Sequence, residues 1–342
     1  MKKIKLFPSG KTFNCEEGQT VLSALEKNGL FLPNNCRAGA CGECKIKVLK
    51  GEYDQGFILD MALSQEERSK GYGLMCMAKV LSEELEIEYA NDDAKPKLFP
   101  PEENRTFIVT EKIPLSSKIV RLKMRSLGKP MRFWPGQYVT LGDDMKRIPY
   151  KSYSIANIPN QDGEISLMVT KLENGVTSSW IHDELKVGDM VRLNGPYGTF
   201  IGDPQADTPV LCLAAGSGLA PIMSLASAAL MRGGFKHPAT ILFSASTEND
   251  LLEIGHFKFM EAKFRNFEFK ATLTKEKKDG YLNGRIPEIL PSLYQDLSKT
   301  SVYIAGSPEF VNACKNAVLK LGAKEELIHE EGFFEQKTNS FF

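Results

Sequence analysis

Four cysteines place the strongest constraint on what this chain can fold into. Cys36, Cys41 and Cys44 lie together in the segment NNCRAGACGECK, and Cys76 follows much later, in the segment LMCM. The spacing Cys-x4-Cys-x2-Cys with a distant fourth cysteine supplies the four thiolates that hold a 2Fe-2S cluster. A zinc site is the alternative, but zinc sites usually carry two Cys-x2–4-Cys pairs, and the second pair is missing here. The pattern favours the iron–sulfur cluster, a carrier of single electrons.

The residues around these cysteines fit the same interpretation. Gly39, Ala40 and Gly42 let the backbone come close to inorganic sulfur and turn its amides inward. Met75 and Met77 flank the fourth cysteine with apolar side chains, which we expect to keep water away from the cluster.

Length and charge exclude several classes of protein. A chain of 342 residues is too long for one typical core, so two or three domains are expected. The 43 basic and 43 acidic residues cancel, which leaves no electrostatic footprint for nucleic acid or a membrane surface. No apolar run is long enough to span a bilayer, and no export signal is present. We therefore expect a monomer in the reducing cytoplasm, with Cys15, Cys212 and Cys314 as small core residues.

The chain divides into three blocks and a linker. Residues 1–92 mix short strands and helices, and residues 93–104 are rich in proline and charge, as linkers are. Residues 105–205 carry short alternating segments separated by turns, which predict a small antiparallel barrel. Residues 206–342 alternate buried apolar strands with helices, which predict a parallel sheet. The expected fold class is multidomain, α+β and α/β.

Local signals in the first block predict individual elements. A hairpin is expected around residues 8–10, and a short helix with Thr20 as its N-cap follows. Ser64 and Glu67 have the spacing of a capping box, which predicts a second short helix. The alternating segment 83–90 is interpreted as an edge strand.

With its cysteine motif, the first block resembles a plant-type ferredoxin domain, which implies a β-grasp-type fold. The second block contains YKSYSIAN, residues 150–157, which resembles the R-x-Y-S signature of the ferredoxin–NADP reductase superfamily. This resemblance implies an FAD-binding barrel in which Tyr153 stacks on the isoalloxazine ring and Ser154 lies near flavin N5, with Ile155 continuing the motif. Lys151 replaces the family arginine; it keeps the positive charge near the pyrophosphate but loses the bidentate fork.

A second piece of the flavin block matches the family in position. Gly175, Val176, Thr177 and Ser178 precede an apolar helical pattern, so they predict a helix N-terminus with free amides and a hydroxyl. Such a terminus suits the pyrophosphate of FAD.

The third block carries a dinucleotide-binding pattern. Gly216, Ser217 and Gly218 follow a buried strand and open a helix, and Pro221 replaces the usual third glycine, a fit for the first helical turn. G-x-G-x-x-P resembles the superfamily's own variant and implies a doubly wound NAD(P)-binding domain.

A second strand–turn–helix lies near the end of the chain. Gly306 and Pro308 match the family's Cys-Gly-x-Pro turn, although Ala305 stands where the family has cysteine. The segment IHEEGFF resembles the aromatic end that covers the flavin in these reductases, so Phe333 or Phe334 is the candidate lid.

Coenzyme preference is read from three positions. Ser246 stands where many relatives carry arginine, and Thr274 and Lys275 stand where NADPH-using relatives carry a Ser-Arg pair. We favour NADH over NADPH, because the segment KKDGYLNGRI resembles NADH-using reductases.

From about residue 2 to residue 334, the chain resembles the ferredoxin-first reductase components of bacterial multicomponent oxygenases. The resemblance implies single-electron transfer from NAD(P)H through FAD and a 2Fe-2S cluster to a terminal oxygenase, either a Rieske dioxygenase or a di-iron monooxygenase. One alternative is a reductase partner of a CDP-deoxysugar dehydrase, similar to CDP-6-deoxy-glucoseen reductase. A third hypothesis is a binding module without turnover, because Lys151, Ser246 and Ala305 depart from the family pattern.

Overall fold

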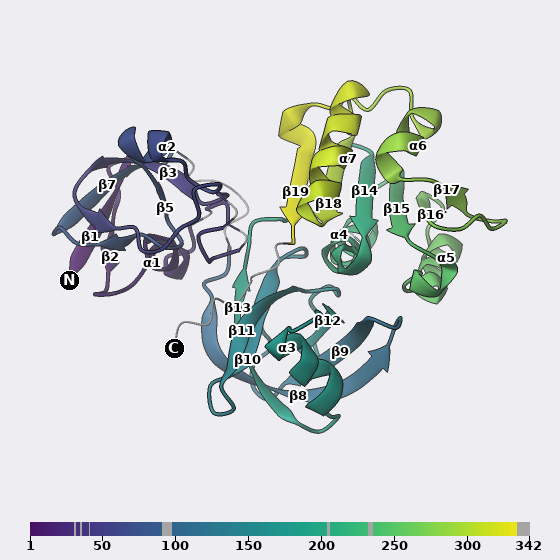
Figure 1. Ribbon diagram of the computed structural model, residues 1–342, viewed down its shortest axis with the longest axis horizontal. Helices are drawn as coiled ribbons and strands as arrows, with labels where there is room; N and C mark the ends of the chain where they lie inside the picture. Colours follow the sequence, from purple (N-terminus) through teal and green to yellow (C-terminus); the bar gives the residue numbers. More distant parts are fainter. Residues whose placement is uncertain are drawn as a thin grey trace. The chain divides into compact units, whose positions relative to one another are not determined.

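The computed structural model describes residues 1–30, 32–34, 36–40, 42–90, 98–203, 206–231 and 235–333 (Figure 1). The chain forms two compact units, Met1–Pro101 and Glu102–Phe333, and each is described by itself. Among these residues, no helix is both long and apolar enough to cross a membrane. Residues 91–97, which hold part of the predicted linker, lie outside the described ranges.

The first unit is a mixed sheet with two short helices. Its five-stranded sheet has the order β2-β1-β7-β3-β5, and β4 pairs with β6 beside it. The elements are β1 (Lys2–Phe7), β2 (Thr12–Cys15), α1 (Val21–Lys27), β3 (Lys45–Lys50), β4 (Tyr53–Asp54), α2 (Gln65–Ser69), β5 (Tyr72–Leu74), β6 (Lys79–Val80) and β7 (Glu84–Glu88).

The local signals of this unit are confirmed. β1 and β2 form the antiparallel hairpin around residues 8–10. The Thr20 hydroxyl accepts the backbone N–H of Ser23 at 3.3 Å and caps α1. Ser64 and Glu67 form the reciprocal capping box of α2, which satisfies two amide donors at the helix start.

The prediction of an edge strand at residues 83–90 is wrong. β7 lies inside the sheet, parallel to β1 and antiparallel to β3. Leu85 and Ile87 are fully buried, whereas Glu86 on the other face reaches Lys5 at 3.0 Å. An interior strand keeps its charged alternation when one face of the sheet is solvated, so alternation alone does not identify an edge.

The second unit begins with an antiparallel barrel module. Its sheet has the order β11-β10-β13-β8-β9-β12, and a bridge between Ile155 and Leu167 joins the two outer strands. β8 begins at Glu102, inside the range predicted as linker. The elements are β8 (Glu102–Pro114), β9 (Ile119–Ser126), β10 (Tyr138–Asp143), β11 (Ile148–Ser154), β12 (Glu164–Thr170), α3 (Val176–Ser179), the π-helical turn η1 (Trp180–Glu184) and β13 (Met190–Tyr197).

A parallel-sheet module completes the second unit. All strand pairs in its sheet, ordered β17-β16-β15-β14-β18-β19, run parallel. The elements are β14 (Val210–Ala215), η2 (Gly216–Gly218), α4 (Leu219–Met231), β15 (Ala239–Ala245), η3 (Glu248–Asp250), α5 (Ile254–Lys263), β16 (Phe267–Leu273), β17 (Leu282–Asn283), α6 (Ile286–Leu293), β18 (Ser301–Gly306), α7 (Pro308–Lys320), η4 (Glu325–Leu327) and β19 (Ile328–Gly332).

Helices cover both faces of this sheet, as predicted for a doubly wound fold. Along β14, Cys212 and Ala214 join a core with α4 and α5, whereas Leu211 and Leu213 join a core with α6 and α7. Because side chains on both faces of β14 are buried, every residue of this strand is apolar. The three cysteines predicted as core residues are buried: Cys15, Cys212 and Cys314.

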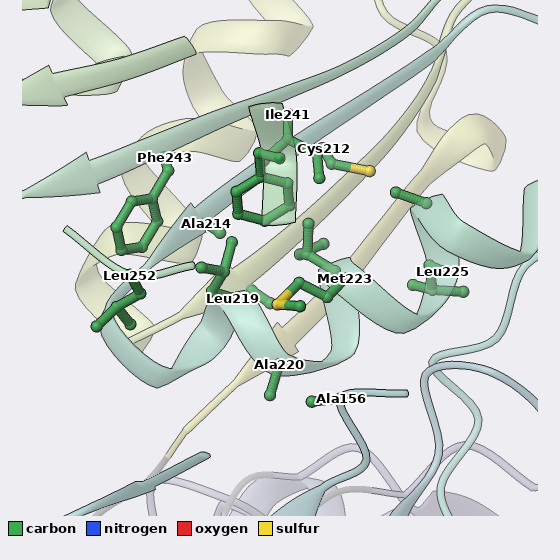
Figure 2. Packing of buried hydrophobic residues seen from close by; sticks show 14 of the residues in the cluster. Ala156, Cys212, Ala214, Leu219, Ala220, Met223, Leu225, Ile241, Phe243 and Leu252 are labelled. Carbon is green, nitrogen blue, oxygen red and sulfur yellow. The ribbon is translucent and has the colours of Figure 1, made fainter. Parts of the chain in front are cut away.

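The barrel and the parallel sheet share one of these cores. Ile119, Ala156 and Met168 of the barrel pack in the same cluster as Ala220 of α4. Figure 2 shows Ala156 beside Ala220, below the strands of the sheet. The Ser224 hydroxyl, also on α4, donates to the Asn157 carbonyl at 2.7 Å. These contacts hold the two modules of the second unit together.

Candidate functional site

The cysteine loop of the first unit gathers buried sulfur and inward backbone donors. Cys36, Cys44 and Cys76 are at most 7% exposed, and the Cys76 N–H donates to the Cys44 sulfur at 3.4 Å. The amides of Ala38 and Ala40 donate to the Cys36 sulfur at 3.4 and 3.3 Å. Cys41, the remaining predicted ligand, lies outside the described residues. Amides that point at sulfur are what the small residues of this loop predict.

Two glycines make the close packing of this loop feasible. Gly39 has a φ of +67°, and a Cβ there would meet the Ile58 side chain at 2.9 Å. Gly42 has a φ of +80°, and a Cβ would meet the Ala62 carbonyl oxygen at 2.9 Å. Since both positions need a left-handed backbone as well as space, only glycine fits without strain.

The donor set fits a thiolate-bound cluster. The hydrogen bond with Cys44 lowers the pKa of the Cys76 thiol, against the opposing effect of burial. Thiolate is the form that binds metal. Within the described ranges, no three His, Cys, Asp or Glu side chains are arranged to hold one metal ion. Four cysteines holding two irons is a different arrangement, and one of the four is outside those ranges.

In the second unit, the end of β11 meets the last described strand. The Ser154 hydroxyl donates to Glu331 Oε2 on β19 at 3.2 Å. Glu331 is 5% exposed, and burial raises its pKa to about 8. At neutral pH the carboxyl group is therefore mostly protonated. Tyr153, the neighbour of Ser154, is half-buried, and this burial raises its pKa.

Glu331 was not predicted from the sequence. Glu330 and Glu331 stand side by side in β19, and only the second is buried. Glu330 points to the surface, where Lys315 reaches it at 2.9 Å. The alternation of a strand assigns adjacent residues to opposite faces, but it does not say which face meets the barrel.

The predicted aromatic lid lies next to the second nucleotide turn. The Phe333 N–H donates to the Gly306 carbonyl at 2.8 Å, and its side chain is half-buried. Phe334, the other lid candidate, lies outside the described residues. Pro308 starts α7, with Ser307 as the N-cap.

The turn that precedes α3 presents amides rather than hydroxyls. Gly175 is the N-cap, and no side chain caps the helix. Thr177 donates its hydroxyl to the Pro149 carbonyl at 2.6 Å, and Ser178 donates to the Gly175 carbonyl at 3.1 Å. The side chains thus shape the turn, and the amides at the start of the helix are its donors for an anion.

Two further observations fit an anionic cofactor here. Burial lowers the pKa of Lys151, which a bound phosphate would offset. Among the described residues, the Trp180 indole N–H that follows α3 is buried without a hydrogen-bond partner.

The two nucleotide turns of the parallel sheet touch each other. A Cβ at Gly218 would lie 2.3 Å from the Ala305 carbonyl oxygen. Gly216 has a φ of +54°, and Pro221 lies in the first turn of α4. Both turns follow the carboxyl ends of neighbouring parallel strands, where dinucleotides bind in such sheets.

The residues predicted to select the coenzyme lie after β15 and β16. The Lys275 N–H donates to the Ser246 carbonyl at 2.9 Å and joins the two strand ends. Glu248 accepts from Lys278, and its own N–H donates to the Glu276 carboxylate. The carboxylates of Glu248 and Glu276 therefore lie near Lys275 and Lys278, at the ends of β15 and β16.

The predicted site residues of the second unit lie in both of its modules. Ser154 contacts the unpredicted Glu331, and Phe333 contacts Gly306 at the end of the strand that pairs with β19. The amide turn at Gly175 belongs to the barrel, and the turn at Gly216 belongs to the parallel sheet.

Family models match three successive parts of the chain. Residues 4–81 match a 2Fe-2S iron-sulfur cluster binding domain. Residues 106–201 match an oxidoreductase FAD-binding domain, and residues 212–316 match an oxidoreductase NAD-binding domain.

Characterised relatives extend over nearly the whole chain. The reductase subunit of an aromatic O-demethylase from Amycolatopsis sp. (strain ATCC 39116 / 75iv2) is 31% identical over 334 residues, which cover 95% of this chain and 96% of the relative. The reductase component of phenol 2-monooxygenase from Pseudomonas sp. (strain CF600) is 32% identical and covers 97% of this chain and 94% of its own. The crystal structure of an Amycolatopsis cytochrome P450 reductase matches with a TM-score of 0.89 at 29% identity, over 97% of this chain and 99% of that one.

Proposed function

Since this chain belongs to the ferredoxin–NADP reductase superfamily and is an NAD(P)H-dependent oxidoreductase with 2Fe-2S, FAD-binding and NAD-binding domains, we propose that it is the reductase component of a multicomponent oxygenase system. The observation that carries this proposal is the cysteine loop of buried sulfurs and inward amides, joined in one chain to a flavin and nicotinamide module. FAD, when bound, takes two electrons from the nicotinamide and releases them singly, which matches the capacity of a 2Fe-2S cluster.

Different residues of the chain are proposed to bind the cluster and the flavin. Cys36, Cys41, Cys44 and Cys76 would hold the cluster, and the amides of the loop would stabilise the charge on its sulfurs. Tyr153 supplies an apolar ring face for the flavin.

In this proposal Ser154 and Glu331 hold a proton beside the flavin. The Ser154 hydroxyl donates to the carboxyl group, which burial keeps protonated at neutral pH. Such a pair places neutral, hydrogen-bonded groups in a site that must exclude water. Phe333, whose N–H donates to the Gly306 carbonyl, is the proposed aromatic cover of this place.

The phosphate groups of both cofactors are held mainly by backbone amides. The amides that follow Gly175 would hold the flavin pyrophosphate, and Lys151 would add a positive charge. The turn at Gly216–Gly218 would hold the pyrophosphate of the nicotinamide coenzyme.

NADH is the proposed electron donor. The Glu276 carboxylate, next to Lys275 in the sequence, accepts from the Glu248 N–H, and Lys278 is already paired with Glu248. A 2′-phosphate bound by Lys275 would therefore lie near carboxylates. Carboxylates repel a phosphate and accept hydrogen bonds from a ribose hydroxyl. We expect kcat/KM for NADH to exceed that for NADPH at least ten-fold, and the opposite order would refute this assignment.

A terminal oxygenase is the proposed electron acceptor, as the names of the relatives suggest. The test is anaerobic purification, followed by analysis for iron, acid-labile sulfide and flavin, and then titration with NADH. We expect flavin bleaching and a rhombic spin signal of the reduced cluster. Zinc in place of iron and sulfide would refute the electron-relay mechanism.

The identity of the electron acceptor is tested by combining the reductase with candidate acceptor proteins and measuring NADH-dependent product formation. NADH-dependent product formation with an oxygenase component supports the proposal, whereas coupling only to a CDP-deoxysugar dehydrase supports the alternative. A monomeric state and a cytoplasmic location are also proposed, and light scattering measures the first.

A further inference from the structure

The last residue of β12 connects the flavin module to the nicotinamide turn. Thr170 ends β12 and pairs with Ile119 of β9. Ile119 itself is buried in the core that the barrel shares with α4. From this fixed position, the Thr170 hydroxyl donates to the Ser217 hydroxyl at 3.0 Å, across 47 positions of sequence.

This contact determines what Ser217 can do. Ser217 lies between Gly216 and Gly218 in the turn η2, and its side chain is only partly buried. Because its oxygen accepts from Thr170, its own proton is left to donate to another group. A hydroxyl that accepts one hydrogen bond becomes a stronger donor for the next.

Thr170 also begins the segment that leads to the turn before α3, where Gly175 is the N-cap and the flavin pyrophosphate is proposed to bind. Two residues later, the Leu172 N–H donates to the Ser178 hydroxyl at 3.1 Å. The Lys171 N–H donates to the Lys118 carbonyl at 2.8 Å and holds this segment beside the start of β9. One strand end therefore supports both anion-binding turns.

We propose that Thr170 is a positioning residue for the nicotinamide coenzyme. Its hydroxyl orients Ser217 so that the Ser217 proton points to the coenzyme pyrophosphate. The same hydrogen bond ties the turn at Ser217 to the flavin module. The function is distinct from that of the turn glycines, which supply amides and space. It depends on a residue of the barrel, outside the nucleotide-binding motif.

The test compares Thr170→Val, which keeps the shape and removes the hydroxyl, with Thr170→Ser, which keeps the hydroxyl. In the holoenzyme, we expect Thr170→Val to raise KM for NADH about three- to ten-fold, the loss expected for one oriented hydrogen bond, with kcat changed less than about two-fold. The competitive inhibition constant of ADP-ribose, which carries the pyrophosphate without nicotinamide, is expected to rise equally. Thr170→Ser is expected to restore both values.

Thr208→Val is the matched control. Thr208 and Ser301 form a hydroxyl pair at 2.7 Å in the same module, but at the amino ends of β14 and β18, away from the nucleotide turns. This variant is expected to keep both constants within about two-fold of the parent.

Three results would overturn the proposal: unchanged constants in Thr170→Val, no rescue by Thr170→Ser, or an equal effect of Thr208→Val. The role proposed for Thr170 depends on the proposed function only in one respect, namely that NADH is the coenzyme used in the test. ADP-ribose is common to both coenzymes, so a preference for NADPH would refute that assignment without touching the ADP-ribose comparison.

Discussion

The charge of Glu331 depends strongly on its surroundings. Its carboxyl group is buried and accepts from Ser154, and burial raises its pKa from 4.5 to about 8. The folded protein thus keeps a proton that the unfolded chain releases above about pH 4.5. Between these two values stability falls as pH rises, because the folded state binds one proton more.

Glu331→Gln removes this dependence. In the parent, we expect Glu331 to lower the free energy of unfolding by about 1 kcal/mol per pH unit across the window from about pH 4.5 to about pH 8. Thermal unfolding of both proteins at pH 5, 6, 7 and 8 measures the difference in slope. Parallel curves for parent and variant would contradict a protonated Glu331 in the folded state.

Cys76 tests the metal ligands separately from the flavin. Cys76→Ser removes one thiolate, and we expect the iron and acid-labile sulfide to fall to less than about half of the parent values, since serine is a poor ligand for this cluster. Flavin content and the rate of flavin reduction by NADH are expected to stay within about two-fold.

The buried Cys15 provides the control for this variant. Cys15→Ser changes a buried cysteine of the same unit that ends β2 and whose thiol donates to the Gln19 carbonyl at 3.7 Å. If Cys15→Ser lost as much iron and sulfide as Cys76→Ser, the assignment of Cys76 as a ligand would fail.

At the scale of elements, strand β9 and the start of α5 are joined by an ion pair. Arg121 of β9 reaches Glu253, the N-cap of α5, at 2.6 Å, with side-chain exposures of 23% and 8%. Glu253 has a left-handed backbone with a φ of +57°, which is uncommon for a residue with a side chain. Its side chain makes no cap for α5 and serves Arg121 instead.

Glu253→Gln keeps the size of the side chain and removes its charge. We expect a loss of about 1–2 kcal/mol in the free energy of unfolding, less than for a fully buried pair, because Arg121 retains Glu111 at 3.1 Å. The control is Glu268→Gln, which breaks the more exposed pair with Lys270 at 2.9 Å and should cost less than about 0.5 kcal/mol. Denaturant unfolding measures both, and equal losses would contradict a special role for the pair.

At the scale of the whole molecule, the two compact units separate the cysteine loop from the flavin and nicotinamide modules. A chain that starts at Glu102 keeps both modules and their shared core. We expect this shortened protein to bind FAD and to be reduced by NADH at a rate within about three-fold of the parent, because each unit has its own hydrophobic core.

The same shortened protein should transfer electrons poorly to a one-electron acceptor. Cytochrome c reduction with NADH is expected to fall at least ten-fold, since the cluster is absent. Undiminished cytochrome c reduction would show that electrons leave from the flavin and would contradict the proposed order.

The features that could be predicted from the sequence are those whose interacting residues lie close together along the chain. The spacing of Cys36, Cys41 and Cys44, the cap at Thr20 and the turn at Gly216 are local patterns, and physical rules read them directly. The pair Ser154–Glu331 joins residues 177 positions apart, so no local pattern reveals it.

Side-chain direction was the other limit. Thr177 and Ser178 occupy the expected turn, but their hydroxyls serve Pro149 and Gly175. Sequence places a hydroxyl near a helix start, and only the packed neighbours decide which acceptor it takes. The interior place of β7 follows from its pairing with β1 and β3, which alternation does not encode.

The distance along the chain between Ser154 and Glu331 also has a consequence for biosynthesis. A ribosome releases β11 long before it makes β19, so a nascent barrel exists for a time without the carboxyl group that it will later meet. The Ser154–Glu331 hydrogen bond can therefore form only after β19 has been synthesised.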